Sequence, residues 1–207
     1  MIKARYGDRL DGWIRAIFPF LFNRKLNPNL LTLLGSLVSG AAALAFATGH
    51  FAVGGLLLLG GGFFDLVDGV VARNQGQSTR FGAFLDSTMD RLVDMVVLLG
   101  IVMYFAAAGD IGIVLLVGVV LVSTVMTSYA KARAETLVPS LPEGVFERGE
   151  RIVLLALGGI LGFLVPVLWI LAIGTTLTVA QRFAAAYREM MILDAAAESG
   201  AGEPSRT

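Results

Sequence analysis

Residues 63–94 read FFDLVDGVVARNQGQSTRFGAFLDSTMDRLVD and set a series of aspartates between long apolar stretches. Asp65 and Asp68 are three positions apart, and Asp86 and Asp90 are four apart, so each pair lies on one face of its own helix. A short connection separates the pairs, and an antiparallel hairpin would bring their carboxylates to the same depth. We therefore expect a helical fold built around this hairpin.

The sequence around this segment has the composition of a membrane protein. Of the 207 residues, 56% are hydrophobic and 15% are charged, and the mean hydropathy is +0.77. Stretches without Asp, Glu, Lys or Arg cover residues 29–64, 95–109, 111–130 and 152–181, and about 20 apolar residues suffice to cross a bilayer. The composition excludes a soluble domain, and the zero formal charge argues against nucleic acid as a partner.

We predict an all-α integral membrane protein with six transmembrane helices, preceded by an N-terminal amphipathic helix in the membrane interface. The expected spans are residues 29–48, 51–72, 81–107, 111–134, 151–164 and 166–187. Residues 1–26 would form the interfacial helix and a linker, because Leu10, Trp13, Ile14, Ile17, Phe18 and Leu21 follow one helical face. An ordinary packing helix has the same pattern. Residues 27–190 would form the catalytic domain, and residues 191–207 a disordered tail.

Basic residues indicate how the chain is oriented. They mark the connections on one side, whereas the turns near His50, Asp110 and Pro166 carry no Lys or Arg. By the positive-inside rule, we expect both termini and the aspartates to face the cytoplasm from a multi-pass protein of the cell membrane. The glycine-rich runs at 54–62 and 158–162 favour close helix packing over a phosphate-binding loop.

Four carboxylates at the membrane edge would repel one another unless a cation lay between them. The chain has no cysteine, and oxygen ligands suit Mg²⁺, Mn²⁺ or Ca²⁺. We expect Asp65, Asp68, Asp86 and Asp90 to hold two divalent ions, Mg²⁺ or alternatively Mn²⁺, an arrangement suited to displacement at phosphorus. Pairing of some of these aspartates with Arg73, Arg80 or Arg91 is the structural alternative. Asp94, one turn further on, is expected to have a hydrogen-bonded structural role rather than to be a metal ligand.

The motif Asp65-x-x-Asp68-Gly69-x-x-Ala72-Arg73, followed after eight residues by Gly82, Asp86 and Asp90, resembles the signature of the CDP-alcohol phosphotransferase family at every position. The resemblance implies transfer of the phosphatidyl group of CDP-diacylglycerol to an alcohol, with release of CMP, in phospholipid biosynthesis. It implies that Asp90 is also the general base. The CDP-lipid would lie along Pro28, Asn29, Leu30, Leu31, Gly69, Arg73 and Thr79. From its residue type alone, Arg73 fits either phosphate binding or an anchor at the membrane boundary.

Three further stretches, SYAKARAE (128–135), FERGER (146–151) and Gln181-Arg182, are similar to the branch of the family that makes phosphatidylinositol phosphate. The resemblance implies that the phosphate of the acceptor, inositol 1-phosphate, is bound by Lys131, Arg133, Arg151 and Arg182. Several cations would stabilise the binding of a phosphorylated acceptor, whereas a neutral alcohol would not need them. Glycerol phosphate, which would make the protein a phosphatidylglycerophosphate synthase, is the alternative acceptor. An ether lipid is an alternative donor, and Arg182 alone also fits a snorkelling anchor.

A cation transporter and a purely structural membrane scaffold fit the sequence less well than an enzyme. A cation transporter would need polar positions through the full depth of the membrane, but the charges here crowd the cytoplasmic third of the spans. A membrane scaffold would explain the glycines and leave the aspartates without a purpose. The small-residue faces and the family resemblance make a homodimer a further expectation.

Overall fold

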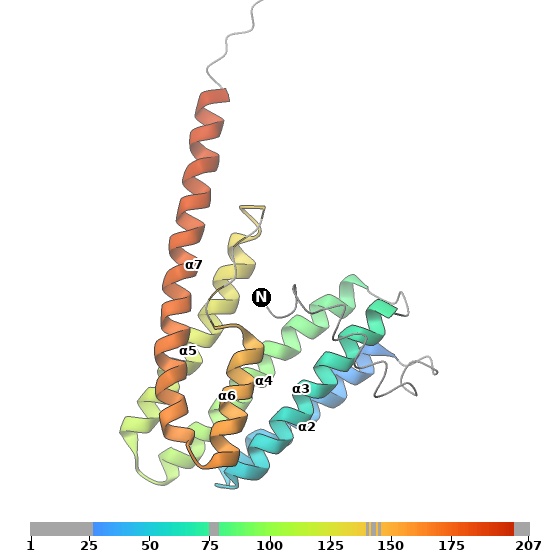
Figure 1. Ribbon diagram of the computed structural model, residues 1–207, viewed down its shortest axis with the longest axis vertical. Coiled ribbons are helices and arrows are strands. Elements are labelled where there is room, and N and C mark those ends of the chain that lie inside the picture. Colours follow the sequence, from blue (N-terminus) through green and yellow to red (C-terminus); the bar gives the residue numbers. More distant parts are fainter. Residues whose placement is uncertain (1–26, 75–78, 140, 142–143, 145, 201–207) are drawn as a thin grey trace, which may run out of the picture.

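The computed structural model describes residues 27–74, 79–139, 141, 144 and 146–200. The interfacial helix expected within residues 1–26 lies outside these ranges, as do residues 201–207 of the expected tail. The described residues form six α-helices and no strand (Figure 1). The helices are α2 (Pro28–Ala47), α3 (Phe51–Asn74), α4 (Arg80–Ala107), α5 (Ile111–Ala134), α6 (Arg148–Leu161) and α7 (Leu164–Gly200).

Local chemistry explains where the helices begin and end. The side chains of Asn27, Thr79 and Asp110 precede α2, α4 and α5, and each accepts a hydrogen bond from a backbone N–H in the first turn. Pro28 occupies the first position of α2, where a missing N–H costs nothing. At the opposite ends, Gly49, Gly109 and Gly162 have φ values of 79°, 77° and 75° in the tight turns. The α2–α3, α4–α5 and α6–α7 connections are therefore short.

The last two helices differ from the expected spans. α6 begins at Arg148, one turn before the expected start, because the Glu150 side chain accepts a hydrogen bond from Glu147 N at 3.0 Å and completes the first turn. α7 has 37 residues and continues to Gly200. Residues 191–200, which we had assigned to the disordered tail, are helical, and the alanines at 195–197 favour that conformation.

Four of the helices are long and apolar enough to cross a membrane: Pro28–Ala47, Phe51–Arg73, Ile111–Ala134 and Leu164–Ala197. The other two helices do not meet this requirement, because α4 carries charged residues in its first half and α6 has only 14 residues. Large apolar side chains are exposed on all six described helices. Such surfaces are rare on soluble monomers and suit contact with lipid, so the protein is a multi-pass membrane protein.

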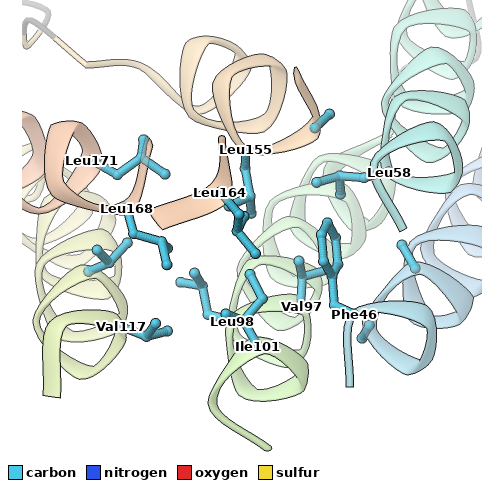
Figure 2. Close-up of a cluster of buried hydrophobic side chains, with 14 of the residues drawn as sticks. Phe46, Leu58, Val97, Leu98, Ile101, Val117, Leu155, Leu164, Leu168 and Leu171 are labelled. Atoms are coloured by element: carbon cyan, nitrogen blue, oxygen red, sulfur yellow. The ribbon is translucent and has the colours of Figure 1, made fainter. Parts of the chain in front are cut away.

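The helices pack in a continuous series, shown in Figure 1. α2 packs on α3 and α4, α3 on α6, α4 on α5, and α7 on both α5 and α6. The main core lies between them, and Figure 2 shows the side chains that fill it. They include Phe46, Leu58, Val97, Leu98, Ile101, Val117, Leu155, Leu164, Leu168 and Leu171.

One glycine contact positions the acidic segment. A Cβ atom on Gly35 of α2 would lie 2.9 Å from the Cβ of Phe64 and 3.1 Å from the carbonyl oxygen of Gly61, both on α3. Only glycine allows the two helices to approach so closely at this level. Because Phe64 directly precedes Asp65, this contact holds the acidic end of α3 against α2.

Candidate active site

Three of the signature aspartates converge between α3 and α4. One carboxylate oxygen from each of Asp65, Asp68 and Asp86 lies within 4.8 Å of the other two. Asp65 and Asp68 share a face near the C-terminus of α3, and Asp86 follows on the second turn of α4. The carboxylates of α3 and α4 thus meet as the spacing of these residues predicts, although both helices pack chiefly on α2 rather than on each other.

A hydroxyl group on α2 fixes the most buried of these carboxylates. Thr32 Oγ1 donates a hydrogen bond of 2.6 Å to Asp68 Oδ2, and both side chains are buried. One oxygen of this carboxylate accepts the hydrogen bond, and the bond also fixes the orientation of the other oxygen. Thr32 lies one turn after Pro28, so α2 contributes to the acidic site as well as to packing. Nothing in the signature itself points to this threonine.

Arg148 is the functional candidate that the sequence did not reveal. Its Nη1 atom lies 2.7 Å from Asp90 Oδ1 and 3.2 Å from Asp65 Oδ2, and its Nε atom lies 3.4 Å from Asp94 Oδ1. We had considered Arg73, Arg80 and Arg91 as partners of the aspartates. Arg148 stands in the quoted FERGER stretch three positions before Arg151, and that helical spacing was the available signal.

Asp94 links the acidic site to a second group of charges. Besides Arg148, it pairs with Arg151, whose Nη2 atom lies 3.4 Å from Asp94 Oδ2. The side chains of Asp94 and Arg151 are only 11% and 9% exposed, so each neutralises a charge that would be costly alone at this depth. The contacts agree with the structural role expected for Asp94, and they extend that role to two arginines.

The second group is centred on Thr127 of α5, which is fully buried. Its Oγ1 atom accepts a hydrogen bond of 3.0 Å from Arg151 Nη1, and its carbonyl oxygen accepts one from Arg182 Nη1. The Nε atoms of Arg151 and Arg182 are buried and have no hydrogen-bond acceptor among the described residues. The structure therefore gathers two guanidinium groups and leaves a donor of each unused. A threonine in an apolar helix usually bonds to its own helix or to a neighbouring one, so the residue type alone does not indicate this role.

Lys131 and Arg133 lie further along α5, near its C-terminus. Lys131 Nζ is 3.9 Å from Glu135 Oε1, and Arg133 Nη1 is 3.4 Å from Thr136 Oγ1. These contacts are local and partly or fully exposed. Of the expected acceptor-binding residues, Arg151 and Arg182 thus meet at Thr127, while Lys131 and Arg133 have their contacts within the end of their own helix.

The residues expected to bind the CDP-lipid surround the opening of the hairpin. Pro28, Asn29, Leu30 and Leu31 form the first turn of α2, and Thr79 caps α4 by accepting a hydrogen bond of 2.9 Å from Gly82 N. A Cβ atom on Gly82 would lie 3.1 Å from Asn29 Oδ1, so the N-termini of α2 and α4 adjoin. Helix N-termini favour anionic groups.

Gly69 and Arg73 lie at the end of α3. A Cβ atom on Gly69 would lie 3.3 Å from Arg73 Nη1, which places the guanidinium of Arg73 directly over the glycine. A bulkier residue at 69 would push that group aside. The motif spacing of four residues is therefore the spacing needed to fold Arg73 back over its own helix.

The three converging carboxylates fit a divalent cation. Their donor set is entirely oxygen, which Mg²⁺ and Mn²⁺ prefer over softer metals. Ligand oxygens on one such ion are separated by up to about 4 Å, twice the metal–oxygen distance. Groups within 4.8 Å of one another need only small side-chain rotations to reach that separation.

Comparison with known families gives one match across most of the chain. The model of the family described as CDP-alcohol phosphatidyltransferase matches residues 25–181. A phosphatidylinositol phosphate synthase of Streptomyces avermitilis is 37% identical, covering 90% of this chain and 84% of its own. An archaetidylinositol phosphate synthase of Methanothermobacter thermautotrophicus is 41% identical, covering 73% of this chain and 75% of its own.

Solved structures give the same result for the fold. The crystal structure of Mycobacterium tuberculosis phosphatidylinositol phosphate synthase with CDP-DAG bound superposes with a TM-score of 0.75 at 32% identity, covering 83% of this chain and 92% of that one. The structure of the same enzyme in complex with manganese and citrate gives a TM-score of 0.76 and covers 88% of that chain. The acidic cluster is therefore found in a chain that resembles a manganese-binding enzyme.

Proposed function

Because the chain belongs to the CDP-alcohol phosphatidyltransferase family, we propose that it transfers the phosphatidyl group of CDP-diacylglycerol to inositol 1-phosphate and releases CMP. The protein is a metal-dependent transferase of phospholipid biosynthesis.

The unused donors of Arg151 and Arg182 are the observation that carries the choice of acceptor. Both Nε atoms are buried and have no acceptor among the described residues, and a buried donor without a partner costs about 1–3 kcal/mol. A phosphate group has several acceptor oxygens and two negative charges, so it could accept hydrogen bonds from both Nε atoms and add negative charge beside the two guanidinium groups. A neutral alcohol such as free inositol would bring no negative charge to these arginines.

The relatives support the same acceptor. Phosphatidylinositol phosphate synthases and archaetidylinositol phosphate synthases differ in the lipid part of their names and share the inositol phosphate part. Similarity to both kinds therefore favours inositol phosphate as the acceptor. The relative that covers 90% of the chain has the phosphatidyl name, so a diacyl donor is preferred over an ether lipid.

The residues divide the reaction between them. Divalent ions, two Mg²⁺ in our proposal, would be held by Asp65, Asp68, Asp86 and Asp90 and would neutralise the diphosphate of the CDP-lipid. Asp90 accepts the proton of the acceptor hydroxyl, whose oxygen attacks the lipid-side phosphorus as the bond to CMP breaks.

The substrates would be oriented on either side of these aspartates. Arg151 and Arg182, together with Lys131 and Arg133 of α5, would hold the acceptor phosphate. The first turn of α2, Gly69, Arg73 and Thr79 hold the nucleotide end of the lipid. Both groups adjoin the acidic cluster, α2 through the Thr32–Asp68 bond and Arg151 through Asp94.

The membrane arrangement follows from the same residues. We propose that α4 and α6 also cross the bilayer, which gives six spans, and that residues 1–26 lie in the interface. Residues 27–190 would be the catalytic domain, with both termini and the aspartates on the cytoplasmic side of the cell membrane. The basic residues at the charged ends of α3, α5 and α6 support that side. The exposed apolar helix faces also suit a homodimer.

The test is CMP release by purified protein in detergent with Mg²⁺ or Mn²⁺ and CDP-diacylglycerol. Release should require an acceptor, and inositol 1-phosphate should give a higher kcat/KM than glycerol 3-phosphate, free inositol or serine. A parallel series with the ether analogue of the donor tests the lipid. Preference for glycerol 3-phosphate or for free inositol would refute the proposed acceptor.

Two matched variants test the assigned residues. Arg182→Gln should raise KM for inositol 1-phosphate by at least tenfold, whereas Arg188→Gln, at an exposed position further along α7, should leave it unchanged. Asp90→Asn should abolish CMP release with the fold retained. Undiminished release in Asp90→Asn would exclude Asp90 as the base.

A further inference from the structure

The guanidinium of Arg148 occupies part of the carboxylate site. Nη1 contacts Asp90 Oδ1 at 2.7 Å and Asp65 Oδ2 at 3.2 Å, and the side chain is 23% exposed. Asp65 therefore takes part both in the contact with Arg148 and in the cluster that it forms with Asp68 and Asp86. The signature aspartates thus form two overlapping cation positions: one bounded by Asp65, Asp68 and Asp86, and one filled by Arg148.

We propose that Arg148 competes with a divalent ion for Asp65 and Asp90, so that the second ion binds only after the guanidinium withdraws. This inference rests on the proposed metal-dependent function. The lone pairs that accept hydrogen bonds from Nη1 are those that an ion would coordinate, and a second cation beside a guanidinium would also be repelled. Binding of the first ion by Asp65, Asp68 and Asp86 would use oxygens that already lie within 4.8 Å of one another.

The surroundings of Arg148 allow the exchange without moving the backbone. Arg148 is the first residue of α6, whose start is fixed by the hydrogen bond between Glu147 N and Glu150. Its Nε atom is held by Asp94 Oδ1 at 3.4 Å. Rotation about the Cγ–Cδ and Cδ–Nε bonds moves the planar guanidinium as one unit, so Nη1 can leave Asp65 and Asp90 while the group stays beside Asp94.

The exchange has a consequence for the base. Asp90 Oδ1 accepts a hydrogen bond of 2.7 Å from Arg148 Nη1, so the guanidinium and the acceptor hydroxyl would share this carboxylate until the second ion displaces Arg148. The displaced guanidinium would remain near Asp94, which already pairs with it. Arg148 is a positioning residue in this scheme, because it acts through Asp65 and Asp90.

The first test counts Mn²⁺ ions by calorimetric titration and by electron paramagnetic resonance, in which two neighbouring ions give a spin-coupled signal. Wild-type protein should bind one ion tightly and a second at least tenfold more weakly. Arg148→Gln should tighten the second step by at least tenfold and leave the first nearly unchanged. Arg151→Gln is the matched control, since it removes an equal charge that pairs with Asp94 and should have a much smaller effect.

An unchanged second step in Arg148→Gln, or equal shifts in the two variants, would overturn the competition. Failure of the wild-type protein to bind any Mn²⁺ would instead overturn the metal-dependent function on which it rests. The two failures are therefore distinguishable.

A second measurement uses the wild-type chain, in case the variant does not fold. Phenylglyoxal modifies free guanidinium groups, and the modified peptides can be quantified by mass spectrometry. Labelling of Arg148 should rise severalfold across the Mn²⁺ range that fills the second site, while labelling of Arg151 stays constant. Constant or falling labelling of Arg148 across that range would overturn the proposal.

Discussion

Replacing Thr32 with valine would test how the buried hydroxyl on α2 supports the metal site. The change keeps the shape of the side chain and removes the 2.6 Å hydrogen bond to Asp68 Oδ2. A hydrogen bond to a charged group contributes about 1.5–3 kcal/mol, and loss of a group that orients a metal ligand typically costs about 10–100-fold in affinity. We expect the Mg²⁺ concentration for half-maximal CMP release, and the Kd for the first Mn²⁺ ion, to rise by that factor.

Ser36→Ala is the matched control for this experiment. Ser36 lies one turn further along α2, and its hydroxyl donates to the carbonyl oxygen of Thr32 at 2.8 Å, without contact to a carboxylate. Its loss should change the metal requirement less than twofold. If Thr32→Val and Ser36→Ala have the same metal requirement as the wild type, then Thr32 does not orient Asp68 and the reasoning is wrong.

Three further outcomes are expected. In steady-state kinetics, Asp94→Asn should raise KM for inositol 1-phosphate about tenfold with little change in KM for CDP-diacylglycerol, because Arg151 loses its ion pair. Equal changes in the two KM values would contradict this prediction. Gly174→Ala should destabilise the protein by about 1–3 kcal/mol, since the added Cβ would lie 2.6 Å from the Phe146 ring, while Gly118→Ala meets nothing within 4 Å. Thermal unfolding in detergent would compare the two, and equal midpoints would count against the close contact. Excess EDTA should abolish CMP release and added Mg²⁺ or Mn²⁺ should restore it, so persistent release in EDTA would argue against a metal enzyme.

The hairpin of the acidic site could be predicted because its information is local. Asp65 and Asp68 share a helix, Asp86 and Asp90 share the next, and the short connection between them leaves little freedom. Helical periodicity and the cost of unpaired charge in lipid were then sufficient to predict that Asp65, Asp68 and Asp86 converge. Asp90 was expected with them and contacts Arg148 instead. The long uncharged stretches predicted the helices in the same way, and the ends of the first four expected spans are close to those of α2, α3, α4 and α5.

Arg148 could not be placed from its own neighbourhood. It meets Asp65 across 83 positions of sequence, and a basic residue near a membrane boundary has an ordinary explanation as an anchor. Thr127 illustrates the same difficulty, because a threonine in an apolar helix usually bonds to its own backbone. Its role is visible only in the folded protein, where Arg151 of α6 and Arg182 of α7 donate hydrogen bonds to it.

The end of α7 was misjudged for a different reason. Small and polar residues after position 190 indicated a disordered tail, yet alanine is also the best helix former. Packing decided between the two conformations, since Ala185, Ala186 and Met190 lie against a small cluster formed by Ala134, the last residue of α5, and by Val138 and Leu141 beyond it. A helix already formed and packed at that point continues at little cost, because its nucleus exists.

The shortness of α6 bears on how water and lipid meet in this enzyme. Fourteen residues rise roughly 21 Å, against a hydrocarbon thickness of about 30 Å. A crossing α6 therefore creates hydrophobic mismatch, which a bilayer relieves by thinning or by admitting headgroups and water. The deficit would fall where α6 begins at Arg148, beside the aspartates. Acyl chains would end early at that point, so a polar metabolite could reach a lipid-borne phosphorus while the lipid stayed in its leaflet.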